Sequence, residues 1–191
     1  MSQHIKLIAG LIIAVCLASP SKADSLIGKS IQVDYRFPNS TTSYGTVSAP
    51  NPFTVVDPGV EAIINIEDVT WLHIDFDPNS LLITLETTLG SPTWATVYQG
   101  QPVTQNGPIF SIIGSFSAIS SVSSTGTTGL SPSAFLSSGV LFVNWAGMTY
   151  HDGDTVTVSF APVPLPAALP LFGGGLLALA WLGRRKKRDT A

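Results

Sequence analysis

The sequence predicts an all-β fold, an antiparallel β-sandwich or jelly roll, for the middle of a chain of 191 residues. Apolar and polar residues alternate with a period of two in several short stretches, as in strands with one buried face. Turn-forming residues separate these stretches at regular intervals, which gives roughly eight or nine short strands. Residues 24–161 show no apolar spacing of the helical kind over ten or more residues.

The expected strands follow one another along the chain. Alternation is clearest at residues 31–37, where Ile31, Val33 and Tyr35 alternate with Gln32 and Asp34. Further strands are expected at residues 62–66, 71–76, 81–85, 109–116, 140–145 and 155–160. Turns rich in Gly, Pro, Asn and Asp are expected at residues 57–59, 77–79, 90–92, 106–108 and 152–154.

One long stretch carries no charge. Residues 87–151 contain no Asp, Glu, Lys or Arg, and residues 115–138 are more than half Ser and Thr. We interpret the second range as two strands joined by a flexible Ser/Thr loop near residues 123–133, with a glycosylated segment as the alternative.

The charges of the chain are segregated. Residues 24–161 are long enough for one domain with a core and too short for two. Their only basic residues are Lys29 and Arg36, against eleven acids, so the domain carries about −9 of formal charge while the whole chain carries −3. An acidic domain repels nucleic acid, which excludes that class of partner, and it suits cationic partners or calcium.

The first 23 residues form the three-part pattern of a signal peptide. A weakly basic start at Lys6 precedes an uncharged apolar run over residues 7–17, and small residues lead to a cleavage site between Ala23 and Asp24. The apolar run is shorter than the roughly 20 residues of a membrane-spanning helix. An uncleaved N-terminal anchor is the alternative.

The only cysteine is Cys16, inside the predicted signal peptide. The domain therefore contains no disulfide, no thiol nucleophile and no cysteine-bound metal. A lipoprotein acylated at Cys16 is a further alternative, although Val15 stands where a small residue is expected.

Residues 162–191 form a sorting and anchor segment with three parts. The motif Val163, Pro164, Leu165, Pro166 and Ala167 leads into an apolar stretch at about residues 167–183, and a basic cluster closes it: Arg184, Arg185, Lys186, Lys187 and Arg188. The cluster is a stop-transfer signal that stays in the cytoplasm. We therefore predict a single C-terminal transmembrane helix with the β-domain outside the membrane.

This tail resembles the PEP-CTERM sorting signals, in the variant whose motif reads Val-Pro-Leu-Pro-Ala. The resemblance implies processing by an exosortase in a Gram-negative bacterium that makes exopolysaccharide. It also implies a protein anchored in the inner membrane before processing, and located at the cell surface or outside the cell afterwards. The Pro-Glu-Pro triplet of the commonest form is absent. A permanently retained single-span anchor is the alternative.

One spacing in the domain matches a metal site. Asp75, Asp77, Asn79 and Glu86 occupy the oxygen-ligand positions 1, 3, 5 and 12 of a calcium loop, but Ser80 stands where that loop needs Gly. The competing interpretation, which we favour, is a β-hairpin that turns through residues 77–80. A second acidic pair, Asp152 and Asp154, flanks Gly153 in another turn.

The sequence contains no recognisable catalytic motif, and its domain has two histidines, His73 and His151. We therefore expect that the protein is not an enzyme and binds no cofactor, with calcium at the loop above as the alternative. The first hypothesis is a surface or matrix protein with a structural or adhesive role, linked to exopolysaccharide or biofilm. The second is a carbohydrate- or calcium-binding module in which exposed Trp71, Trp94 or Trp145 stacks on sugars. A polymer hydrolase is the third.

Overall fold

The computed structural model describes residues 25–114, 116–126 and 131–161, which belong to one compact unit. This part of the chain is all-β and antiparallel, as predicted, and contains no helix; accordingly, no membrane-spanning helix is found within it. The predicted signal peptide, its cleavage site and the sorting and anchor segment lie outside the described residues.

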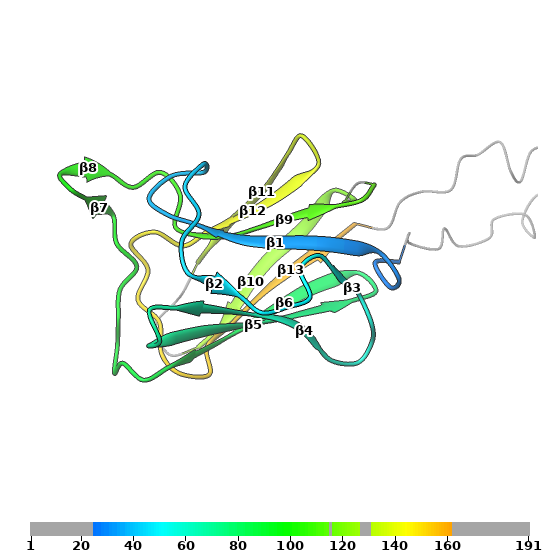
Figure 1. Ribbon diagram of the computed structural model, residues 1–191, viewed down its shortest axis with the longest axis horizontal. Helices are drawn as coiled ribbons and strands as arrows, with labels where there is room; N and C mark the ends of the chain where they lie inside the picture. The colour runs from blue at the N-terminus through cyan, green and yellow to red at the C-terminus, as the bar shows by residue number, and fades with distance from the viewer. Residues whose placement is uncertain (1–24, 115, 127–130, 162–191) are drawn as a thin grey trace, which may run out of the picture. The chain divides into compact units, whose positions relative to one another are not determined.

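The strands form two main sheets, shown in Figure 1. Sheet A has the order β11 (Ser133–Ser137), β12 (Val140–Asn144), β9 (Gly107–Ile112), β1 (Ser30–Arg36), β3 (Phe53–Thr54). Sheet B has the order β10 (Ile119–Thr125), β13 (Thr155–Phe160), β6 (Ser80–Thr87), β5 (Thr70–Asp77), β4 (Val60–Ile66), β2 (Thr46–Val47). A separate short hairpin joins β7 (Val97–Tyr98) to β8 (Gln101–Pro102).

Alternation in the sequence becomes alternation in burial. In β1, Ile31, Val33 and Tyr35 are almost completely buried, whereas Gln32 is exposed and Asp34 half-buried. β5 and β6 behave in the same way. Each strand therefore turns one face to the core and one to solvent, because successive side chains point to opposite sides of a sheet.

The core lies between the two sheets. Phe76 of sheet B packs edge-on against Phe110 of sheet A, with ring centroids 5.4 Å apart and an interplanar angle of 85°. Phe53 of β3 and Phe116 also contact Phe76. Burying an aliphatic or aromatic side chain of this size stabilises a fold by roughly 1.5–3 kcal/mol, so this shared layer holds the sheets together.

Four of the five predicted turns lie in connections between strands, including residues 57–59 and 90–92, and one does not. The β5–β6 hairpin turns through Pro78 and Asn79, with Asp77 paired to Ser80, as predicted. The turn at residues 152–154 leads into β13. The turn predicted at residues 106–108 is wrong, since β9 begins there.

Gly107 explains the departure. It has φ +157°, and a Cβ at this position would come within 2.2 Å of the Val143 carbonyl oxygen. Glycine is therefore required by the close approach of two strands rather than by a reversal of the chain. Pro108 pairs with Tyr35 in the regular β1–β9 register.

The Ser/Thr-rich stretch forms two strands, as predicted. β10 covers Ile119–Thr125 and β11 covers Ser133–Ser137, so only the two ends of the loop expected near residues 123–133 belong to strands. Residues 127–130, in the middle of that range, lie outside the described residues. Both strands are edges of their sheets.

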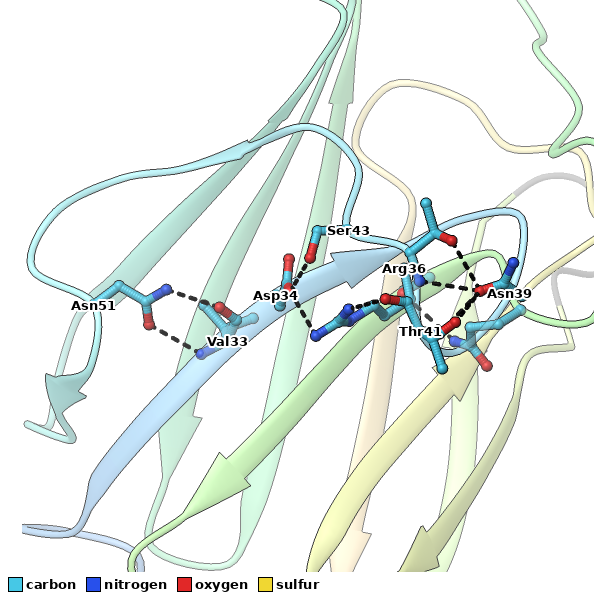
Figure 2. Close-up of polar contacts among 10 residues, drawn as sticks. Val33, Asp34, Arg36, Asn39, Thr41, Ser43 and Asn51 are labelled. Atoms are coloured by element: carbon cyan, nitrogen blue, oxygen red, sulfur yellow. Dashed lines mark hydrogen bonds and ion pairs between the residues drawn. The ribbon is translucent and has the colours of Figure 1, made fainter.

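The free side of β1 is covered in three different ways. β3 pairs with its first two residues, Ser30 and Ile31. Further along, the Asn51 side chain donates from Nδ2 to the Val33 carbonyl at 2.8 Å and accepts from the Val33 N–H at 3.1 Å (Figure 2). Arg36 then forms an isolated antiparallel bridge with Ser43.

Candidate functional site: an aromatic cleft at one end of the sandwich

The residues of the predicted calcium loop are spread along the β5–β6 hairpin. Asp77 accepts from the Ser80 hydroxyl at 3.0 Å within the turn. Glu86 lies opposite Trp71, six positions along β6 from Ser80, which is the partner of Asp77. Strand positions of about 3.4 Å each therefore separate Asp77 from Glu86 along the hairpin. The Asn79 carbonyl accepts from the Phe160 N–H at 2.8 Å. The register thus does not bring the four residues together.

Glu86 has a different partner. Its Oε2 lies 2.8 Å from His73 Nε2, across the exposed face of sheet B. His73 therefore lies on the polar face of its strand, as predicted. The second histidine, His151, donates its backbone N–H to buried Asp154 Oδ2 at 2.8 Å. The second acidic pair is also structural in its contacts, since Asp152 Oδ1 accepts from the Thr87 N–H at 3.0 Å.

Asp75 and Asp77 instead share one region with Asp57 and Glu61. Burial, followed by the charges of Asp77 and Asp57, raises the pKa of Asp75. Burial also raises the pKa of Glu61, although its carboxylate accepts the backbone N–H groups of Phe76 and Val56. Within the described ranges, no group of three or more His, Cys, Asp or Glu side chains is arranged to hold a metal ion.

The tryptophans do not form an exposed platform. Trp145 is fully buried and Trp94 is 7% exposed, which contradicts the expectation that either stacks on a sugar at the surface. Trp71 is half-buried on the outer face of sheet B. The physical reason is that Trp145 continues the buried alternation of Leu141 and Val143 in β12.

The two buried tryptophans instead belong to an aromatic cluster with Tyr35 and Tyr150. Trp94 stacks on Tyr150 with centroids 4.5 Å apart and planes 12° apart, and on Trp145 at 5.4 Å and 27°. Tyr35 lies 5.9 Å from Trp94 and 6.3 Å from Trp145. Ring pairs of this kind contribute roughly 0.5–1.5 kcal/mol beyond the area they bury.

A polar network holds the cluster in place. The Tyr35 hydroxyl donates to Asn106 Oδ1 at 2.7 Å and accepts from Trp145 Nε1 at 3.0 Å. The Tyr150 hydroxyl lies 2.7 Å from Thr70 Oγ1. Burial raises the pKa of Tyr35 well above its ordinary value and also raises that of Tyr150. Both hydroxyls therefore keep their protons at any physiological pH.

A cleft of about 190 Å³ opens beside this cluster. It lies where β1, β4 and β6 end and β5 and β9 begin, so loops from both sheets form its walls. Its lining combines aromatic, aliphatic and polar side chains: Tyr35, Phe37, Tyr44, Ile66, Glu67, Val69, Thr70, Leu89, Pro92, Thr93, Trp94, Ala95, Asn106 and Tyr150.

Tyr44 and Glu67 form the lip of the cleft. The Tyr44 hydroxyl donates a short hydrogen bond to Glu67 Oε1, and this bond raises the pKa of Tyr44 to about 12. Glu67 and Asp68 follow each other with φ of +55° and +56°, a conformation that costs a non-glycine residue about 1 kcal/mol or more. Asn65 offsets this cost through two hydrogen bonds to Asp68, at 2.6 and 2.9 Å.

The segment between β1 and β2 carries Phe37 and Tyr44 to the cleft, and polar contacts brace it (Figure 2). Arg36 forms an ion pair with Asp34 at 2.9 Å and donates to the Thr41 carbonyl at 2.7 Å. Asp34 also accepts from the Ser43 hydroxyl at 2.6 Å. One of the two basic residues of the domain therefore has a structural task next to the site.

One hydrogen-bond donor of a cleft-lining residue has no partner among the described residues. Trp94 Nε1 is buried and makes no hydrogen bond there. An unsatisfied buried donor costs about 1–3 kcal/mol. Trp94 thus lines the cleft while its N–H carries this cost inside the domain.

The sequence reasoning missed this cleft. Its lining spans Tyr35 to Tyr150, and only tertiary structure brings those residues together. The sequence contained one signal of it. The period-two alternation indicates that Tyr35 is buried, and a buried tyrosine hydroxyl needs a hydrogen-bond partner elsewhere in the chain. No family model, curated protein or solved structure matches this chain.

Proposed function

We propose that this chain is an exported, non-enzymatic surface or matrix protein whose β-domain adheres to a neutral polysaccharide through the aromatic cleft. The observation that carries the adhesive role is the cleft itself, whose lining combines aromatic rings with the Glu67 carboxylate and other polar side chains. Small-molecule sites in proteins typically combine apolar walls with a few polar groups that fix orientation.

The chemistry of the lining matches a sugar ring. A pyranose has apolar C–H faces, which pack on aromatic rings, and hydroxyl groups that both donate and accept hydrogen bonds. At the cleft, aromatic rings supply the apolar wall and the Glu67 carboxylate supplies an acceptor. The volume of about 190 Å³ suits one small unit of a polymer rather than a drug-sized ligand.

Charge restricts the polymer to a neutral or cationic one. The domain carries about −9 of formal charge, and its only basic residues are Lys29 and Arg36. Arg36 is held in the ion pair with Asp34. An anionic polysaccharide would be repelled over most of the surface, so neutral polysaccharides are the class of ligand that we favour.

The delivery route in this proposal is that of a PEP-CTERM protein. A signal peptide directs export, the C-terminal helix anchors the chain in the inner membrane, and an exosortase processes the tail at the Val163–Ala167 motif. The mature protein then lies at the cell surface or in an exopolysaccharide layer. Intact-mass measurement on protein from its host tests this route, and a mass that still includes residues 184–191 contradicts it.

Binding of neutral oligosaccharides, followed by tryptophan fluorescence and calorimetry, tests the adhesive role. Tyr44→Ala removes a half-buried ring at the lip and should weaken binding about tenfold or more, equivalent to about 1.4 kcal/mol. Trp71→Ala is the matched control, because Trp71 is half-buried outside the cleft lining. Equal losses for Tyr44→Ala and Trp71→Ala would place binding elsewhere.

A further inference from the structure

In the described part of the chain, the four edges of sheets A and B differ in how well they are protected against pairing with another strand. β2 and β3, the edges next to β4 and β1, contain two residues each. β10 is longer, but a register shift between Ile119 and Ser121 interrupts its pairing with β13. Short and bulged edges are the usual means by which proteins prevent strand addition.

β11 is neither short nor bulged, and β10 approaches it without pairing with it. It is the last strand of sheet A, and all five of its residues, from Ser133 to Ser137, pair with β12 in regular register. It carries no charged side chain and no proline. Figure 1 shows the β11–β12 hairpin at the outer side of sheet A. An unprotected regular edge presents a row of backbone groups that can pair with another strand.

An apolar stripe continues from this edge over the outer face of sheet A. Phe135 in β11 is 47% exposed and lies flat on Phe142 of β12, with centroids 4.9 Å apart and planes 3° apart. Phe142 pairs in turn with Ile109 of β9. Three successive strands therefore place an apolar side chain in one row across the sheet, and the row ends at the open edge.

The sequence of β11 is symmetric in polarity. It reads Ser133, Ala134, Phe135, Leu136, Ser137, with the serines and Phe135 facing out and Ala134 and Leu136 packed against the core. Antiparallel pairing of two copies about Phe135 would match every outward residue with an outward one and every inward residue with an inward one. An interface around a two-fold axis requires this kind of self-complementarity.

Charge also favours this edge over the charged strands as a contact between copies. Every acid of the described domain lies before residue 87 or after residue 151, and β7 to β12 carry no Asp, Glu, Lys or Arg. Two copies with about nine negative charges each repel one another most strongly where the charged strands face each other. The β11 edge lies in the uncharged part of the domain, where that repulsion is weakest.

We propose that the β11 edge binds a second copy of this chain, strand to antiparallel strand, with Phe135 opposite Phe135 of that copy. The two A sheets then form one continuous sheet, and the apolar stripes of the copies join across the two-fold axis. This contact is independent of the proposed polysaccharide site, which lies at the end of the sandwich. The buried area is small, so the pairing is weak in dilute solution and favoured where the chains are concentrated on a surface.

Site-directed cross-linking of the full chain in the membranes of producing cells tests the pairing. Disulfides require Cα atoms about 4.4–6.8 Å apart. Phe135→Cys should give a disulfide-linked dimer on oxidation. Ser133→Cys alone should stay monomeric, because antiparallel pairing places Ser133 and its copy about 13 Å apart. Co-expressed Ser133→Cys and Ser137→Cys chains should cross-link to each other.

Two controls make the experiment decisive. Ile113→Cys replaces an apolar residue that is 77% exposed, more than Phe135, and should not cross-link. The wild-type chain, whose only cysteine is Cys16, reports any cross-link formed there. The mixed Ser133→Cys and Ser137→Cys arm keeps Phe135, so it decides the question even where Phe135→Cys fails to fold. Monomers in that arm, or an equally strong dimer from Ile113→Cys, would overturn the proposal.

Discussion

The β5–β6 and β11–β12 hairpins have the same architecture and opposite surroundings. Each joins two antiparallel strands through two turn residues. The first lies inside sheet B, between β4 and β13, and carries His73, Asp75 and Glu86 on its outer face. The second forms an edge of sheet A and carries no charge.

The difference runs against the usual rule for edges. Charged residues normally protect strands whose backbone is open to other chains. Here the charges lie on strands that are already paired on both sides, while the open strand presents serines and a phenylalanine. The β5–β6 hairpin is therefore specialised for stability within one chain, and the β11 edge is suited to contact between chains.

The largest effect should come from Phe76→Ala in β5. Phe76 is fully buried and contacts two rings of the opposite sheet, Phe53 and Phe110, so the substitution should cost about 3–5 kcal/mol of unfolding free energy. Phe135→Ala in β11 should cost about 1 kcal/mol or less, since the ring is 47% exposed. Urea unfolding of the two variants measures both values, and similar costs would contradict the assignment of β11 as an open edge.

Effects of intermediate size on stability are expected from substitutions in the two hairpin turns, and these effects should differ between the turns. Ser138 and Gly139 turn the β11–β12 hairpin with φ of +51° and +80°, whereas neither Pro78 nor Asn79 has positive φ. Gly139→Ala places a Cβ in open space but in a left-handed conformation, so it should destabilise the domain by about 1 kcal/mol.

Asn79→Ala is the matched substitution in the other turn. The hydrogen bond at this position uses the Asn79 carbonyl, which the change leaves intact, so we expect a loss within about 0.5 kcal/mol. Thermal unfolding of both variants makes the comparison. A larger loss for Asn79→Ala than for Gly139→Ala would show that backbone conformation does not distinguish the hairpins.

The smallest effect should be a pH-dependent change in Tm, seen for a substitution in the charged β5–β6 hairpin and absent for one in the β11–β12 hairpin. The raised pKa of Asp75 means that the folded state holds its proton more tightly than the unfolded state. The protonated Asp75 carboxyl therefore contributes its full stabilisation of the fold below the unfolded-state pKa of about 3.9. This stabilisation is lost as the pH rises through the folded-state pKa. Asp75→Asn should therefore raise the Tm at pH 7 by a small amount that vanishes near pH 3.

Ser137→Ala in β11 provides the control for that measurement. No Asp, Glu, Lys or Arg lies on β11 or β12, so the Tm difference from the wild type should stay constant from pH 3 to pH 8. An Asp75→Asn difference that grows as the pH falls would reverse the sign expected from the raised pKa.

The fold class followed from local patterns because period-two alternation is written into each strand. β1, β4, β5, β6, β12 and β13 all fall within or close to the stretches predicted from it. β10 and β11 were expected as two strands without defined bounds, because serine and threonine do not reveal which face is buried. Gly107 was assigned to a turn because close packing against Val143 leaves no mark in the local sequence.

The candidate sites were harder to predict, for a physical reason. Ligand spacing along a chain describes a loop, and in a hairpin the same spacing distributes Asp77 and Glu86 along the strands. The cleft depends on contacts between residues up to about a hundred positions apart, such as Tyr35 with Trp145. Local composition does not contain such contacts, and a tryptophan placed at the surface by composition alone proved to be part of the core.

The side-chain amide of Asn51 limits how many copies of this chain can pair through sheet A. By bonding both the N–H and the carbonyl of Val33, it occupies the place that a partner strand would take, next to the two residues of β3. Sheet A therefore has one side that can accept a neighbour and one that is closed by its own chain. Sheet A can therefore pair with only one neighbouring molecule, and a protein that pairs with only one neighbour cannot extend an assembly any further. Pairing through β11 consequently stops at two molecules, which distinguishes a surface coat of discrete pairs from a growing fibril.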